Sequence, residues 1–141
     1  RRNTPGMNTE NYPNTAPLQF LPHMSWDRRG EVPKSPGIYA ISKGTPENLI
    51  YVGLTQQTDG LRGRLGQFHR SATTGMHNHA GGVTYHKLFG PEVSDLIFTV
   101  HLAEIPTTSP RDLSDYLRTA ERSAIWEHIA RHGRPPACNK A

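Results

Sequence analysis

The sequence predicts a small mixed α/β fold of the α+β kind, in which helices flank a three-stranded antiparallel sheet. Two short β-rich runs, Gly37 to Ser42 and Leu49 to Leu54, are separated by a segment with the Gly, Pro and Asn of a turn. A third run, residues 95–105, is rich in β-branched and aromatic residues. Two further segments have the apolar spacing of amphipathic helices. The order strand, strand, helix, strand, helix fits a chain of 141 residues, which is the size of one domain.

The first 35 residues are predicted to form an extended or partly disordered arm. Up to about residue 22 they are rich in Asn, Thr and Pro, and the stretch from Leu18 to Leu21 holds their one apolar cluster, so burial cannot offset the entropy of ordering them. The alternatives are a strap that packs this cluster onto the domain and a tether to a neighbouring domain. Trp26 is expected in the core. The compact domain is predicted to span residues 36–141.

The hairpin places two tyrosines on neighbouring strands. Residues two apart in a strand share a face, so Tyr39 lies with Ile41, and Tyr51 lies with Gly53. Two phenols can therefore meet on one side of the hairpin, and the missing Cβ of Gly53 would allow a ligand to approach the backbone closely. The simpler interpretation is that the tyrosines are cross-strand packing residues.

The first helix is predicted from four apolar residues on one stripe: Leu61, Leu65, Phe68 and Ala72. Gly63 and Gly66 weaken this helix, each by on the order of 1 kcal/mol relative to Ala. Close approach of a nucleic-acid backbone is one reason for glycine there. Residues 73–83 are predicted to form a glycine-rich loop, and residues 84–91 a short turn or helix.

The last helix is predicted to run from about Pro110 to His132, after an N-cap at Ser109 and before a stop at Gly133. On its helical projection Glu121 falls among apolar residues that face the interior. A buried carboxylate is unfavourable unless it is paired or bound to a metal. Glu121 is therefore expected either to form an internal salt bridge or to bind a hard divalent cation such as Mg²⁺.

Composition restricts the classes of partner. A net charge of +4 suits a polyanion, and the single cysteine, Cys138, cannot form an intrachain disulfide. No run is apolar enough for a membrane span or a signal peptide, so we expect a soluble protein with no membrane partner. A cytoplasmic location is expected, with delivery as part of a secreted toxin as the alternative. Because the chain begins with Arg1 and not Met, we also expect it to be a piece of a longer protein.

Two triplets carry a family resemblance. Gly37-Ile38-Tyr39 and Tyr51-Val52-Gly53 resemble the paired signature of the GIY-YIG nuclease superfamily, with Val in place of the second Ile. The stretch from Leu61 to Leu65 is similar to the L-x-x-R-L run that opens the family's first helix. The resemblance covers about residues 36–139 and implies a GIY-YIG type core. It implies a metal-dependent endonuclease that hydrolyses phosphodiester bonds of nucleic acid, DNA more than RNA, as a restriction, mobile-element, repair or toxin module.

The resemblance also implies roles for residues of the site. Tyr39, or alternatively His69, would accept the proton of the attacking water, and Tyr51 would position the phosphate. Arg64 would bind the scissile phosphate, and Glu121 would hold one Mg²⁺ or Mn²⁺ ion. Asn139 would orient the site. A free phenol with a pKa of about 10 is a poor base at neutral pH, so Tyr39 needs the metal ion or an arginine to lower its pKa.

The sequence departs from the family pattern at one position. The family usually has His or Tyr four residues after the arginine, where this chain has Phe68. His69 follows it, but a residue five positions on is turned about 140° from Arg64. Either His69 reaches the centre or pairs with Arg62, or a histidine of residues 73–83 takes the role, or the role is dispensed with. Contacts to nucleic acid are expected from four further side chains: Arg62, Arg70, His77 and His79.

The alternative function is a catalytically impaired nucleic-acid-binding module with the same fold. Phe68 in the place of His or Tyr is the feature that favours it.

Overall fold

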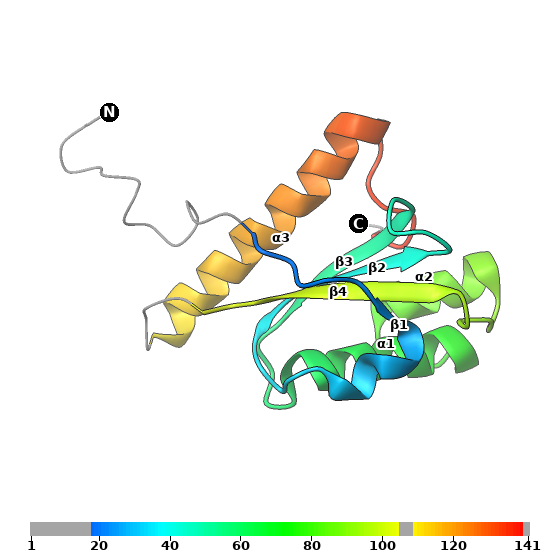
Figure 1. The fold of residues 1–141 in the computed structure, drawn as a ribbon, viewed down its shortest axis with the longest axis horizontal. Helices are drawn as coiled ribbons and strands as arrows, with labels where there is room; N and C mark the ends of the chain where they lie inside the picture. The colour runs from blue at the N-terminus through cyan, green and yellow to red at the C-terminus, as the bar shows by residue number, and fades with distance from the viewer. Residues whose placement is uncertain (1–17, 105–108, 140–141) are drawn as a thin grey trace.

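The computed structural model describes residues 18–104 and 109–139 and has a mixed α+β fold (Figure 1). Its centre is a four-stranded antiparallel sheet with the strand order β1-β4-β2-β3. The first 17 residues of the predicted arm, and residues 140 and 141 of the predicted domain, lie outside the described ranges. No helix within those ranges has the length and apolar character that crossing a membrane requires.

The three predicted strands form, and a fourth joins them. Strands β2 (Gly37–Lys43) and β3 (Leu49–Thr55) make the hairpin, and β4 (Leu96–Leu102) pairs with the other side of β2. The addition is β1 (Met24–Ser25), which pairs with β4 at the outer edge and corrects the expected three strands to four. A two-residue strand has no periodicity of its own, because the alternation that marks a strand needs at least four residues.

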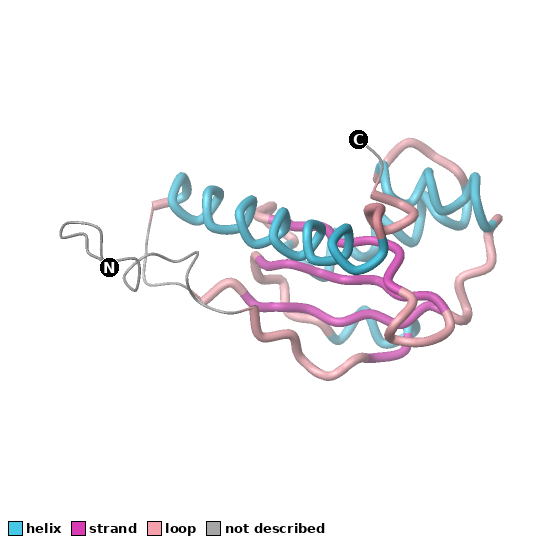
Figure 2. The backbone as a smooth tube through the Cα atoms, turned by 90° about the horizontal axis from the view of Figure 1, so that it is seen from above, coloured by secondary structure: helices cyan, strands magenta, loops and turns pink. Residues whose placement is uncertain are grey.

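The helices cover both faces of the sheet. Helix α1 (Gly60–Thr74) and the short 3-10 helix η3 (Trp26–Glu31) pack on one face, and α3 (Pro110–His132) packs on the other. Figure 2 shows α3 lying along the strands. Each face has its own apolar cluster, the larger under α1 and the smaller under α3. Cys138 is buried in the larger cluster, and the sheet therefore lies between two cores.

Helix α2 (Ala80–Phe89) begins inside the segment predicted to be a glycine-rich loop. His79 is its N-cap, with Nδ1 accepting from the backbone N–H of Gly82 at 3.3 Å. A Cβ on Gly81 would collide with the ring of Tyr51, and one on Gly82 would lie 2.7 Å from the carbonyl oxygen of Phe68. Both glycines are thus required for close packing of a helix, not for a loop.

The described part of the N-terminal arm follows the domain surface. The backbone N–H of Leu21 donates to the carbonyl of Val100 at 2.9 Å, and Leu18 packs against the cluster under α3. Trp26 is buried at 3% exposure, as predicted. For residues 18–21 this is the arrangement of the strap alternative.

Candidate active site

Tyr39 and Tyr51 lie side by side in the hairpin, with ring centroids 5.8 Å apart. In the register of β2 and β3, Tyr39 is opposite Gly53. A Cβ on Gly53 would be 2.5 Å from Cζ and from the hydroxyl oxygen of Tyr39. The glycine therefore makes room for the Tyr39 ring, where sequence analysis expected it to make room for a ligand. Tyr39 is fully buried and Tyr51 is half-buried.

A histidine completes this aromatic group. The Nε2 atom of His79 lies 2.7 Å from the hydroxyl oxygen of Tyr39. Since Nδ1 of the same ring accepts from Gly82, the neutral ring carries its proton on Nε2 and donates it to Tyr39. Burial, and then the charge of Arg64, lower the pKa of His79 to about 3. His79 is thus a neutral donor at physiological pH.

Arg64, on α1, is the cation of the site. Its charge opposes the burial that raises the pKa values of Tyr39 and Tyr51, and it also lowers the pKa of His79. Its side chain is half-buried, and Nη1 donates to Oε1 of Gln67 at 2.5 Å. Arg62 is exposed, and its Nε donates to the carbonyl of Val32 at 2.7 Å. Of the two arginines that the sequence offered, Arg64 is the one beside the tyrosines.

The structure does not bring His69 to this group. Its Nδ1 accepts from the indole N–H of Trp26 at 3.0 Å, and it lines a separate pocket of about 460 Å³ together with Arg29. Burial, followed by the charge of Arg29, lowers the pKa of His69. The reason is geometric: α1 is one unbroken helix despite its glycines, so a residue five positions from Arg64 stays turned away.

Phe68, in the position where the family has His or Tyr, packs on the histidine that is present. Its ring lies edge-on to His79 at 5.2 Å, and the Tyr51 ring is also 5.2 Å from His79. The ring of His79 is therefore held between two aromatic side chains, with Tyr39 at its Nε2 atom. Packing from several sides fixes the orientation of the ring.

Glu121 approaches from α3. Its charge raises the pKa of Tyr51, after the larger effect of burial. Burial raises the pKa of Glu121 itself, and the charge of Arg122 opposes that rise. Within the described part of the chain the carboxylate accepts no hydrogen bond and forms no ion pair, so the expected internal salt bridge is not formed there.

This carboxylate fits one hard cation. Mg²⁺ needs oxygen ligands and often takes only one or two from the protein, keeping water for the rest. No group of three or more His, Cys, Asp or Glu suited to a metal occurs among residues 18–104 and 109–139. A zinc site of the usual four-ligand kind thus has no match among these residues, and Glu121 is the carboxylate that a single hard cation could use.

Asn139 binds the free edge of β3. Its Oδ1 accepts from the N–H of Val52 and its Nδ2 donates to the carbonyl of Val52, both at 2.8 Å. The N–H of Cys138 donates to the carbonyl of Ile50, also at 2.8 Å. Asn139 thus holds the strand between Tyr51 and Gly53, which makes it a positioning residue for the hairpin.

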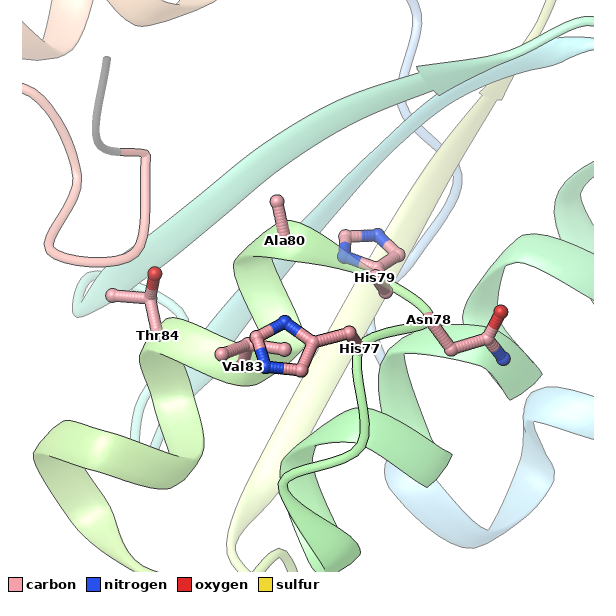
Figure 3. A pocket seen from close by; sticks show the side chains of 6 residues that line it. All are labelled: His77, Asn78, His79, Ala80, Val83 and Thr84. Carbon is pink, nitrogen blue, oxygen red and sulfur yellow. The ribbon is translucent and has the colours of Figure 1, made fainter.

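The remaining candidates lie around this centre. His77 and His79 line a pocket of about 480 Å³ at the start of α2, where their imidazoles point in different directions (Figure 3). His77 is exposed, as is Arg70 on α1. Both are accessible to a ligand, whereas the Nε2 atom of His79 is already hydrogen-bonded to the Tyr39 hydroxyl.

Comparison with known proteins gives no match: no family model, no curated protein and no solved structure is significantly similar to this chain.

Proposed function

We propose that this chain is a metal-dependent endonuclease of the GIY-YIG type, which hydrolyses phosphodiester bonds of nucleic acid and acts on DNA more than RNA. One observation carries the proposal: an arginine, two tyrosines and a neutral buried histidine converge, and a carboxylate is near enough to affect the pKa of Tyr51. Phosphodiester hydrolysis needs a base, a cation at the transferring phosphate and a metal ligand. These side chains supply each kind of group.

In this mechanism Tyr39 accepts a proton from the attacking water. Burial raises the pKa of Tyr39 well above 10, which by itself opposes this role. Two groups favour the phenolate: the charge of Arg64, and the Nε2–H of His79, which donates to the same oxygen at 2.7 Å. In this proposal His79 takes the role of the histidine that the resemblance expects on α1, although it comes from the start of α2.

Arg64 binds the phosphate in this proposal. A guanidinium presents several donors to a phosphate and stabilises the charge that develops on its oxygens. In the free protein one donor is directed to Gln67 on the next turn of α1. Gln67 thus holds Arg64 in place before substrate arrives.

Glu121 is the residue that would hold one Mg²⁺ or Mn²⁺ ion, and such an ion, when bound, supplies positive charge at the leaving oxygen. Tyr51 lies within electrostatic range of both Glu121 and Arg64. In this proposal the hydroxyl of Tyr51 orients the phosphate.

Phe68 is the residue that favours the alternative of an impaired binding module. Phe68 packs edge-on against His79 and so has a structural role within the site.

Cleavage of supercoiled plasmid DNA tests the proposal. The wild-type chain and a Glu121→Ala variant are incubated with Mg²⁺, Mn²⁺ or EDTA, with Glu127→Ala as the control, since Glu127 is an exposed carboxylate on the same helix. We expect cleavage by the wild type and Glu127→Ala proteins, only with metal, and none by Glu121→Ala. Binding of DNA by the wild type with no cleavage of DNA or RNA would contradict the proposal and favour the binding module.

A further inference from the structure

The outer face of α3 carries a ridge of three residues that the proposed mechanism does not use. Arg118, Arg122 and Trp126 follow one another at intervals of four residues, and all three are exposed. This spacing places successive side chains about 6 Å apart along the helix axis on one face. We call these three residues the α3 ridge.

Trp126 is unusual in this setting. It is 68% exposed, more than any other large apolar side chain in the described ranges, whereas Trp26 is 3% exposed. Trp126 belongs to neither apolar cluster, although its neighbours Ala124 and Ile125 pack against the cluster under α3. Single exposed apolar side chains are ordinary on protein surfaces, so Trp126 indicates a contact site only together with the groups beside it.

The guanidinium groups of the two arginines have no partner in the described structure. Within residues 18–104 and 109–139 neither guanidinium forms an ion pair or a hydrogen bond, although burial raises the pKa of Glu121 and the charge of Arg122 opposes that rise. Their donors are therefore available to an external anion. Guanidinium groups at this spacing suit the successive phosphates of a nucleic-acid strand.

The ridge runs beside the helix face that carries Glu121. Arg118 and Arg122 lie three residues before and one residue after Glu121, and Trp126 lies five residues after it, about 7.5 Å along the axis. At about 100° per residue, the two arginines are turned by about 60° and 100° from Glu121, and Trp126 by about 140°. A strand that leaves the proposed active site would therefore cross the arginines and pass round the helix to reach Trp126.

We propose that the α3 ridge binds a single-stranded segment of the nucleic-acid substrate, with its phosphates on Arg118 and Arg122 and an unpaired base stacked on Trp126. That this segment continues from the scissile phosphate rests on the proposed function. An exposed indole stacks on the face of any base, but in a duplex those faces are covered by neighbouring base pairs. The ridge thus selects a substrate with an unpaired stretch next to the cut, such as a flap, a bubble or a frayed end.

Tryptophan fluorescence tests the proposal directly, because one of the two tryptophans is buried and the other is on the ridge. The wild-type chain in EDTA, which prevents metal-dependent cleavage, is titrated with a short oligothymidylate and with a blunt DNA hairpin. We expect the single strand to quench the exposed emission, and the Trp126→Phe variant, which retains only Trp26, to show no quenching. The blunt hairpin should bind at least several-fold more weakly.

Anisotropy of a labelled oligothymidylate measures the role of the arginines. We expect Arg118→Ala/Arg122→Ala to bind about 10-fold more weakly or worse, and to lower the slope of log affinity against log salt by about 1.4, as loss of two single-strand phosphate contacts requires. The control is Arg28→Ala/Lys34→Ala, which removes the same charge from η3 and the loop after it, on the other side of the sheet.

Three results would overturn the proposal: no quenching in the wild type, equal affinities in the ridge and control variants, or self-association of the chain that depends on Trp126. The last would identify the ridge as an interface between copies. Plasmid cleavage separates this failure from that of the proposed function. If the ridge variants bind and cleave as the wild type does, the nuclease stands and the ridge proposal fails. If the ridge binds single strands but neither the wild type nor any variant cleaves, the ridge proposal stands and the proposed nuclease function fails.

Discussion

The hydroxyl oxygen of Tyr39 and the Nε2 atom of His79 are 2.7 Å apart, in a position where both side chains are buried. The pair joins the central strand β2 to the first turn of α2. Inside an otherwise apolar cluster, Tyr39 is the acceptor for the Nε2–H of His79, so removing the Tyr39 oxygen leaves that donor unpaired, whereas the Tyr39 hydroxyl also interacts with Tyr51 and Arg64. This makes the pair both a structural connection and the most specific feature of the candidate site.

Replacing Tyr39 by Phe removes only the oxygen. We expect plasmid cleavage to fall by about 10²- to 10⁴-fold, the range for loss of a general base. The free energy of unfolding should fall by about 1–3 kcal/mol, because the Nε2–H of His79 loses its acceptor. Tyr85→Phe is the matched control, since the Tyr85 hydroxyl contacts Lys43 and the Glu92 carbonyl instead. Full turnover by Tyr39→Phe would exclude it as the base.

The two candidate histidines should differ in their effect on cleavage. His79→Ala removes the donor to Tyr39, so we expect at least a 10-fold loss of rate, measured on plasmid DNA with Mg²⁺. His69→Ala loses a hydrogen bond from Trp26 and should keep its rate while losing about 1 kcal/mol of stability. The reverse order of effects would place the His69 side of α1 at the reaction centre.

Stability should depend on pH through His79. Its pKa in the folded protein is about 3, below the usual value of 6.5, so between these values the unfolded chain binds a proton that the folded chain does not. The stabilisation is complete above about pH 6.5 and is lost as the pH falls toward 3. Relative to His79→Asn, which keeps an N-cap residue, the wild type should lose up to about 1.4 kcal/mol for each pH unit. Denaturant unfolding at several pH values measures this difference, and parallel curves would contradict it.

Two glycines near the site should respond in opposite directions to alanine. Gly53→Ala places a methyl group against the Tyr39 ring and should lower the free energy of unfolding by about 1–3 kcal/mol. Gly66 lies in α1, and no atom is within 4 Å of the place that its Cβ would take, so Gly66→Ala should raise it by about 0.5–1 kcal/mol. Thermal or urea unfolding of both variants tests this. A stabilised Gly53→Ala protein would show that Tyr39 can move away.

The sequence predicted the elements that are long enough to show an apolar periodicity of their own. The hairpin, the α1 stripe and the 23-residue helix α3 were all apparent from spacing and caps. Strand β1 has only two residues, and its partner on β4 is more than 70 residues away, so it exists through tertiary pairing alone. Elements of that kind leave no local pattern.

The start of helix α2 was predicted wrongly, and the choice among the histidines was left open, for a related reason. Gly81 and Gly82 indicated a loop, but each is glycine because another element packs against it, the Tyr51 ring in one case and the α1 backbone in the other. Sequence alone left His69, His77 and His79 as alternatives. What separates them is which ring reaches Tyr39, and that depends on where α2 begins.

The bonds of Asn139 also affect how copies of the protein meet. Strand β3 lies at one end of the sheet, and an uncovered outer strand offers its backbone groups to any extended chain, including another molecule of the same protein. The amide of Asn139 presents an N–H donor beside a carbonyl acceptor, as neighbouring backbone groups do, and it occupies both backbone groups of Val52. Together with the bond from the N–H of Cys138 to the carbonyl of Ile50, these contacts leave the middle of β3 without free backbone groups at Ile50 C=O and Val52, so an incoming strand would first have to displace residues 138 and 139 there.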